Sequence, residues 1–372
     1  MSNLCEIFAD NIKELRKKHS ITQKALADKL GCTEKAVSKW ERGMSIPGIE
    51  ILLLVAKMFQ VNVESLFYDA KTVYFLGISA GEDTTTLVLT DRKCAVLKRI
   101  QTQSINPNII DMEKHKDILR SAIYKVCGDV DFSSVVVYTG ISNITSDVQY
   151  VEFNEFFESF GFKHASCEFS INSYFAATLG DADGILLAMG AGAGVHCMVD
   201  GKYSHSGGRG YLLSDNGGMY NIGRDGINAF FSEYDGIGES TLITKEIQEN
   251  FGADIRKLYE DIYYKGRRNI DKFAEFVYSA AEKGDEIAVN IIKKNMKAIA
   301  KYVEVFEEKF GNRKIPLVLI ASGMDKAGRL DYLKNEFKNP DKYEISIFNG
   351  DPAIGAAMLA KKEYERLFTD EN

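Results

Sequence analysis

The sequence contains no long apolar run. In its 372 residues no stretch of about 18 apolar residues occurs that could span a bilayer. No early segment joins a basic start to an unbroken apolar run, as a secretion signal does. A basic amphipathic helix is absent as well, which argues against attachment to a membrane surface. We therefore expect a cytoplasmic protein without a membrane partner.

Paired cysteines are also lacking. The six cysteines stand singly, with no C-x-x-C pair and no histidine at a zinc-ligand spacing. Cys167 lies close to His164 and Cys197 adjoins His196, but isolated neighbours of this kind are far more often ordinary residues than ligands. We expect six reduced thiols and no metal site.

Positive charge is scarce outside the first seventy residues. Residues 1–70 carry ten Lys/Arg and nine Asp/Glu, which leaves 36 of the 46 basic and 44 of the 53 acidic residues for the remainder. The two parts therefore have net charges of +1 and −8. Only the first part is suited to bind a polyanion, and the length favours two or three domains.

The first seventy residues predict four or five short helices. Apolar residues recur at helical spacing and stop at short breaks. Thr22 and Thr33 stand at N-cap positions, and Gly31 and Gly43 stand where helices end. The result is helix-turn-helix geometry. The repeating apolar positions are Phe8, Ile12, Leu15, then Ala25, Leu26, Leu30, then Ala36, Val37, Trp40, then Ile51, Leu54, Ala56 and Phe59.

The stretch "ITQKALADKLGCTEKAVSKWERGMSIP" resembles the Cro-type helix-turn-helix family, of lambda-repressor-like fold, without gaps over residues 8–67. The resemblance implies that residues 33–39 enter the major groove and that a dimer binds two half-sites. The alternative is a small helical bundle with a charged solvated face. The DNA-binding residues expected from this pattern are Gln23, Thr33, Glu34, Lys35, Ser38, Lys39 and Arg42.

Beyond residue 70 the pattern becomes α/β. Short Val/Ile/Leu-rich runs predict buried strands, and longer periodic stretches predict helices. The expected strands lie at 72–78, 85–90, 133–140, 184–190, 194–200, 315–323 and 343–350, and the expected helices at 113–126, 171–180, 272–311 and 353–368.

Three glycine-containing turns follow expected strands, at 79–85, 190–194 and 321–328. Glycine lets backbone N–H groups approach an anion closely, so such turns are possible phosphate cradles. Each alone is more often only a turn. Three in this order, with "SGGRGYLLSDNGGMYNIGRDG" between the second and third, carry more weight.

Residues 72–362 resemble the N-acetylglucosamine kinase-like branch of the actin/hexokinase superfamily, which includes the BadF-type ATPases. The segments that carry the resemblance are "SINPN", "GGRGYLLSDNGGMYNIGR", "ASG" and "DPAIGAAMLA". It implies an all-α helix-turn-helix head (1–69) followed by an α/β, actin-like (ribonuclease H-like) two-lobed ATPase fold (70–372). Lobe I would comprise about 70–181 with helix 353–368, and lobe II about 182–352.

The resemblance also implies ligand sites. By position, the expected sugar-binding residues are Asn106, Ser173, Gly207, Gly208 and Asp215, and the expected nucleotide-binding residues are Gly81, Thr85, Gly190, Gly192, Ser322 and Gly323. For the glycines, the alternative to ligand contact is a role in shaping a turn.

The kinase pattern fails at its catalytic groups. Phosphoryl transfer needs a metal and a carboxylate, yet Ser79 and Ser173 stand at the two positions where the family has aspartate. The second turn has Ala191 and Ala193 in place of hydroxyl residues. Further replacements are Arg209 for tryptophan, Asn216 for glutamate and Asp83 for a phosphate-binding threonine, while Glu82 or Asp83 are the only nearby substitutes for the lost metal ligand.

These observations predict a transcription regulator with a degenerate kinase body, a pseudokinase that senses an amino sugar, sugar phosphate or nucleotide and forms a homodimer. Its expected partners are operator DNA and a sugar-derived effector, with no catalytic residues assigned. The alternatives are an active amino-sugar kinase or ATPase that also binds DNA, using ATP with Mg²⁺, and a body that serves dimerisation only.

Overall fold

The computed structural model describes residues 4–61, 63–67, 73–81, 84–105, 112–142, 147–210, 213, 215–252, 255–265, 270–321, 324, 326 and 328–368. Contacts divide the chain into two compact units, 1–177 with 351–372, and 178–350. Within the first unit we call residues 4–67 the head and the remainder lobe I. The second unit is lobe II.

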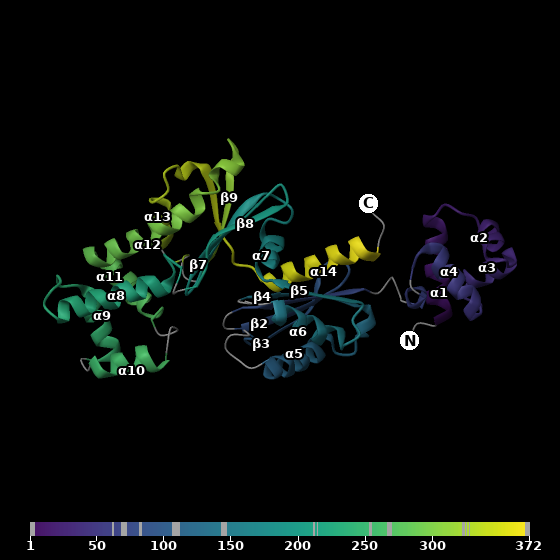
Figure 1. The fold of residues 1–372 in the computed structure, drawn as a ribbon, viewed down its shortest axis with the longest axis horizontal. Helices are drawn as coiled ribbons and strands as arrows, with labels where there is room; N and C mark the ends of the chain where they lie inside the picture. Colours follow the sequence, from purple (N-terminus) through teal and green to yellow (C-terminus); the bar gives the residue numbers. More distant parts are fainter. Residues whose placement is uncertain are drawn as a thin grey trace. The chain divides into compact units, whose positions relative to one another are not determined.

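The head consists of the expected short helices (Figure 1). Phe8, Val37 and Trp40 are buried in one core. The apolar periodicity predicted a buried Leu54, and this was wrong: Leu54 is 47% exposed, because Leu52 and Val55 take the buried positions of its helix. The elements are α1 (Leu4–Lys18), α2 (Gln23–Leu30), α3 (Glu34–Trp40), α4 (Ile49–Phe59) and the 3-10 helix η1 (Glu64–Phe67).

The predicted caps of the helix-turn-helix are confirmed. The hydroxyl of Thr22 accepts a hydrogen bond from Ala25 N (3.1 Å), and that of Thr33 accepts one from Ala36 N (3.2 Å). Gly31 ends α2 with φ of 68°, a left-handed conformation that glycine adopts without strain. These contacts fix where α3 begins.

Lobe I contains a five-stranded mixed sheet in the order β3-β2-β1-β4-β5. Helices α5 and α6 cover one face, and α14 covers the other, where Phe75 and Val136 meet Ala357. The elements are β1 (Tyr74–Ala80), β2 (Thr84–Thr90), β3 (Val96–Gln103), α5 (Met112–Cys127), η2 (Phe132–Ser134), β4 (Val135–Ile141), α6 (Asp147–Glu158), β5 (His164–Phe169), α7 (Ile171–Thr178) and α14 (Pro352–Phe368).

The sheet of lobe II has the order β10-β9-β6-β7-β8, which repeats the topology of lobe I. Its helices share one core with the sheet. The elements are β6 (Gly184–Met189), β7 (Ala193–Val199), β8 (Lys202–Gly207), α8 (Met219–Tyr234), α9 (Leu242–Phe251), α10 (Ile255–Lys265), α11 (Phe273–Glu282), α12 (Glu286–Glu304), η4 (Glu307–Phe310), β9 (Ile315–Ala321), α13 (Arg329–Lys334), η5 (Pro340–Lys342) and β10 (Tyr343–Ile347).

The predicted fold class is confirmed: a helical head precedes two sheets that share one strand order. One element was predicted wrongly, because the continuous helix expected at 272–311 is two helices, α11 and α12. Gly284, with φ of 85°, ends the first, and Asp285 caps the second by accepting from Ala288 N. The six cysteines are free, as expected. Within the described ranges no helix is long and apolar enough to cross a membrane.

Candidate functional site

The outer surface of α3 presents the side chains that the sequence assigned to DNA. Glu34, Lys35 and Lys39 are exposed, and Ser38 is partly exposed, while Val37 and Trp40 point into the core. An exposed helix that combines lysines with a carboxylate and a hydroxyl is suited to phosphate and base contacts in a major groove.

The ends of this surface are held in fixed positions. Thr33 is exposed and caps α3, so its hydroxyl is already used by the helix. Arg42, just beyond α3, is exposed and donates from Nε to the carbonyl of Ser38 (3.1 Å). Its terminal guanidinium nitrogens extend past that contact and can reach a phosphate.

A partly buried ion pair supports the helix-turn-helix on the side away from the exposed face of α3. Arg16 of α1 donates to both carboxylate oxygens of Glu41 (2.5 and 3.0 Å), and Gln23 Nε2 donates to Glu41 as well (2.8 Å). Burial raises the pKa of Glu41, but the hydrogen bonds from Arg16 and Gln23 outweigh it, and the pKa lies below its usual value. Gln23 is thus held in one orientation at the start of α2.

In lobe I, the described backbone groups at the turn after β1 form hydrogen bonds within the lobe. Gly81 N donates to Thr84 O (2.9 Å), and Ser104 Oγ donates to Gly81 O (2.9 Å). Thr85 Oγ1 accepts from Ile105 N (3.2 Å), so this expected phosphate ligand already has an internal partner. Glu82 and Asp83, the candidate substitutes for a metal ligand, and Asn106, the expected sugar ligand, lie outside the described residues.

Both serines that replace aspartate are buried in lobe I. Ser79 is 5% exposed near the end of β1 and lies beside Gly140 of β4 in the sheet register. Ser173, in the first turn of α7, is fully buried, and its Oγ has no hydrogen-bond partner among the described residues. A Cβ on Gly140 would lie 2.6 Å from that oxygen.

The structure adds three neighbours that sequence reasoning did not find: Gly140, Ser142 and Ser170. The hydroxyls of Ser142 and Ser170 are 2.8 Å apart, next to the carboxyl ends of β4 and β5. Only the rule that ligands bind at the carboxyl ends of parallel strands could have suggested them. The four serines described at this end of lobe I offer neutral hydroxyls, which can hydrogen-bond a ligand but do not hold Mg²⁺ as carboxylates do, while the nearby carboxylate of Glu168 accepts from Tyr138 OH and Asn172 Nδ2.

In lobe II, the glycines of the second turn have different surroundings. A Cβ on Gly190 would meet nothing within 4 Å, so this residue faces open space. A Cβ on Gly192 would lie 2.2 Å from Oδ2 of Asp215, and one on Gly218 would lie 2.6 Å from the carbonyl oxygen of Ala191. Gly192 is therefore required by packing, whereas the packing leaves Gly190 accessible to a ligand.

Asp215 joins the neighbouring turns of lobe II. It is 6% exposed, its Oδ1 accepts from Gly210 N (3.1 Å), and its carbonyl accepts from Asn221 Nδ2 (2.6 Å). Gly207 and Gly208 have φ of 73° and 66° and pack against β7. The expected sugar-binding residues of lobe II thus come together around one loop, and each also has a structural role.

The replaced positions nearby are neutral or basic. Asn216, where the family has glutamate, donates from Nδ2 to Tyr302 OH (3.2 Å), and Arg209 is exposed. Ser322 and Gly323, the expected adenosine-site residues, lie outside the described residues. Elsewhere in lobe II, hydrogen bonds from Arg329 of α13 lower the pKa of Glu275 of α11 to about 2.

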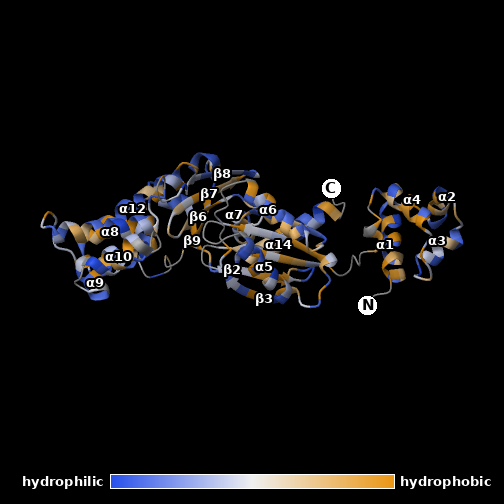
Figure 2. Cartoon of the chain, turned by 60° about the horizontal axis from the view of Figure 1, so that its bottom comes forward, coloured by the Kyte–Doolittle hydropathy of each residue, from blue (hydrophilic) through white to orange (hydrophobic). Residues whose placement is uncertain are grey.

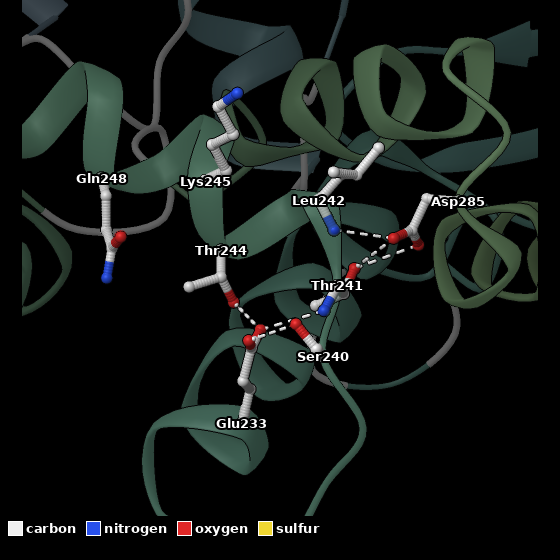
Figure 3. A pocket seen from close by; sticks show the side chains of 8 residues that line it. All are labelled: Glu233, Ser240, Thr241, Leu242, Thr244, Lys245, Gln248 and Asp285. Atoms are coloured by element: carbon white, nitrogen blue, oxygen red, sulfur yellow. Dashed lines mark hydrogen bonds between the residues drawn. The ribbon is translucent and has the colours of Figure 1, made fainter.

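One further hollow lies in lobe II, with a volume of about 370 Å³. Figure 3 shows its two carboxylates on either side of Thr241. Glu233 accepts from Thr241 N (3.0 Å), and Asp285 accepts from Leu242 N (2.7 Å), so both acids cap helices. We assign it a structural role. It is lined by Glu233, Ser240, Thr241, Leu242, Thr244, Lys245, Gln248 and Asp285.

Comparison with known proteins identifies the body. The sequence profile described as BadF/BadG/BcrA/BcrD ATPase family matches residues 76–360. The chain belongs to this family. A helix-turn-helix profile matches residues 12–66, so this BadF-type chain carries a DNA-binding type of head.

Two relatives reflect the two parts. The N-acetylmuramic acid/N-acetylglucosamine kinase of Clostridium acetobutylicum is 26% identical over 312 residues, which cover 78% of this BadF-type chain and 99% of the kinase. The HTH-type transcriptional activator BcrR of Enterococcus faecalis is 30% identical over 91 residues, 24% of this chain and 39% of BcrR.

Solved structures agree on the fold. A protein provisionally named N-acetylglucosamine kinase from Chromobacterium violaceum aligns with a TM-score of 0.64 at 18% identity, covering 78% of this BadF-type chain and 99% of that one. A ROK family glucokinase from Streptomyces griseus aligns with a TM-score of 0.51 at 14% identity, covering 78% and 99%. The body therefore has the fold of sugar kinases.

Proposed function

We propose that this chain is a sequence-specific transcription regulator whose kinase-like body senses a small ligand: an amino sugar, a sugar phosphate or a nucleotide. The observation that carries the proposal is the contrast between a complete, exposed recognition surface on α3 and the serines at both catalytic positions of the body. We propose further that the chain acts in the cytoplasm as a homodimer.

DNA binding is supported by the distribution of charge. Lys35, Lys39 and Arg42 are exposed on or beside α3, where phosphates and guanine edges lie in a major-groove complex. Glu34 is exposed on the first turn of α3 and is suited to accept from a cytosine amino group. The remainder of the chain is acidic, so electrostatics favour contact through the head.

Loss of catalysis is supported by the chemistry of lobe I. Transfer of a phosphoryl group requires Mg²⁺ and a carboxylate that positions or deprotonates the acceptor hydroxyl. At the end of β1 and the start of α7 the described residues offer hydroxyls instead, and a serine without an activating base does not accept a proton near neutral pH. The hydroxyls of Ser79 and Ser173 do not fit Mg²⁺.

Ligand sensing is supported by what the body retains. Gly190 faces open space in lobe II, and the expected sugar-binding glycines and Asp215 remain around one loop. The named activity of the Clostridium relative makes amino sugars the first effectors to test. We propose that a ligand favouring one arrangement of the lobes shifts that equilibrium and alters the spacing of two heads on DNA.

The second candidate is an active amino-sugar kinase or ATPase that also binds DNA. It is favoured by the match to almost the whole length of a kinase. Sustained ATP consumption that depends on an amino sugar, and that Asp215→Asn abolishes, would replace the pseudokinase proposal.

The DNA-binding half is tested by selecting duplexes from a random library with the full chain and measuring affinity against salt. We expect Lys39→Ala to weaken binding roughly tenfold and to reduce the salt slope by about 1. Lys13→Ala, an exposed lysine of α1, is the matched control and should change neither. Failure to enrich any sequence would contradict the proposal.

The sensing half is tested by thermal shift of the full chain with amino sugars, their phosphates, muropeptide-type sugars and ATP. A ligand that raises the unfolding temperature should also change the affinity for the selected duplex. A ligand that stabilises the chain without altering DNA affinity would leave binding intact but refute the regulatory coupling. Failure of every one of these ligands to bind would favour the alternative of a body that serves dimerisation only.

A further inference from the structure

Helix α4 carries an apolar face that the described part of the chain leaves uncovered. Leu53 is 57% exposed, Leu54 47% and Ile49 76%. The opposite side of the helix, with Leu52 and Val55, already fills the core of the head. Figure 2 shows α4 orange along much of its length. Three large exposed side chains on one short helix are unusual unless they meet a partner.

The charges around this face are arranged symmetrically. Glu50 precedes Leu53 by three residues, and Lys57 follows Leu54 by three residues. Both charged side chains are exposed. Reversing the direction of the helix about the midpoint between the two leucines therefore exchanges Leu53 with Leu54 and Glu50 with Lys57. We call Glu50, Leu53, Leu54 and Lys57 the α4 face.

Such a pattern is complementary to itself. If two α4 helices cross antiparallel on a two-fold axis, Leu53 meets the partner's Leu54, and Glu50 lies beside the partner's Lys57, each contact occurring twice. A parallel crossing would instead bring Glu50 near the partner's Glu50, which is repulsive. The surface thus selects a second copy of this chain, in one orientation, over an unrelated apolar partner.

We propose that α4 pairs antiparallel with α4 of a second copy when two heads occupy neighbouring half-sites on DNA. The proposal rests on the proposed DNA-binding function and names the surface through which two heads cooperate. A single pair of short helices buries less than the roughly 1,200 Å² of a stable interface. The contact is therefore weak in free heads, forms in a fraction of them at high protein concentration, and becomes dominant when DNA holds two heads side by side.

The charge pattern gives the decisive experiment. Full-length variants are titrated onto a selected duplex with two half-sites and onto the same duplex with one half-site destroyed, and the ratio measures cooperativity. We expect Glu50→Lys and Lys57→Glu each to lower cooperativity roughly fivefold, since two ion pairs become repulsive. The double variant Glu50→Lys/Lys57→Glu should restore it to within about twofold of wild type.

The matched control is Glu14→Lys on α1, which adds the same charge at an exposed position outside the α4 face. It should leave cooperativity unchanged, although it adds the same positive charge near DNA. Unchanged cooperativity in the two single variants, or a double variant that stays as poor as either one, overturns the proposal.

A second measurement does not depend on DNA. Isotope-labelled and unlabelled full chains are mixed at high concentration and treated with a carbodiimide, which joins a carboxylate directly to an amine. We expect a mixed-isotope peptide that links Glu50 to the partner's Lys57. Within one chain these residues are about 10 Å apart along the helix, so isotope composition separates a link within one chain from a link between two chains.

A chain that gives no mixed-isotope product, whether it is monomeric or dimeric through its body, overturns the proposal. Because this readout needs no duplex, it separates failure of the α4 face from failure of DNA binding.

Discussion

The head and the body place their functional groups differently. On the head, Lys35 and Lys39 project from a helix whose core is built by other residues. In the body, the side chain of Asp215 fills the space that a Cβ on Gly192 would need, and Ser173 is fully buried. Functional residues on the head can therefore change without unfolding it, whereas those in the body also hold the fold. The presence of Gly192 and Asp215 in the body is therefore weaker evidence for ligand contact than the presence of Lys35 and Lys39 is for DNA contact, because packing alone explains it.

The chain contains one tryptophan, Trp40, which lies in the core of the head. Its fluorescence therefore reports unfolding of the head alone, while far-ultraviolet circular dichroism reports the whole chain. The two regions can be perturbed and followed separately in the intact protein.

The largest effect is expected for Gly77→Val in β1. A Cβ at this position would lie 2.0 Å from the carbonyl oxygen of Ala353 and 2.4 Å from Ala357 N, so α14 must be displaced. We expect a loss of roughly 4 kcal/mol or more of unfolding free energy, seen in circular dichroism. The Trp40 transition should be unchanged, and Gly190→Ala, whose Cβ meets nothing, is the control.

Next in size is Glu41→Gln in the head. It leaves the guanidinium of Arg16 without its carboxylate partner, and that side chain is only 14% exposed. We expect a loss of about 3 kcal/mol in urea unfolding followed by Trp40 fluorescence. Circular dichroism of the body should retain its transition. Glu14→Gln, an exposed glutamate on α1, controls for the loss of one charge; an equal effect there would refute the assignment.

The same carboxylate predicts a pH dependence of the head. The pKa of Glu41 is lowered in the folded state, so its contribution to stability is complete above its unfolded pKa of about 4.3 and declines as pH falls through the folded value. We expect the Trp40 transition in urea to move to lower urea below about pH 4.3. In Glu41→Gln this part of the acid destabilisation should vanish.

The smallest effect is expected for Ser173→Ala in lobe I. The hydroxyl has no partner among the described residues, so its removal relieves a desolvation cost, and stability should stay equal or rise by up to about 1 kcal/mol. Thermal unfolding by circular dichroism tests this. A loss of more than about 1 kcal/mol would mean that the oxygen has a structural partner.

Much of the fold was predictable because buried strands leave a clear pattern. The runs around Val136 and Leu187 are apolar on both faces, and both form central strands. The edge strands β3, β5 and β8 were missed because their exposed sides carry polar residues and they lack that pattern. Leu54 was misplaced because period alone does not tell which side of a wholly apolar helix faces the core.

The candidate site was predictable in part. Ser79 lies at the end of a buried strand, and its position near the turn could be read from the sequence. That Ser173 lies against Gly140, and that Ser142 meets Ser170, depends on the register and twist of separate strands. Sequence reasoning has no access to such distances, since the partners are about thirty residues apart.

The position of α14 in lobe I bears on how the protein is made. This helix covers Phe75 and Val136 but is encoded after all of lobe II. During synthesis the head is complete long before lobe I is, because one face of the lobe I sheet stays exposed until Pro352–Phe368 has left the ribosome. A nascent chain thus carries a folded head ahead of an unfinished body. Premature termination before Pro352 would release a head that retains α3 but is joined to an aggregation-prone sheet.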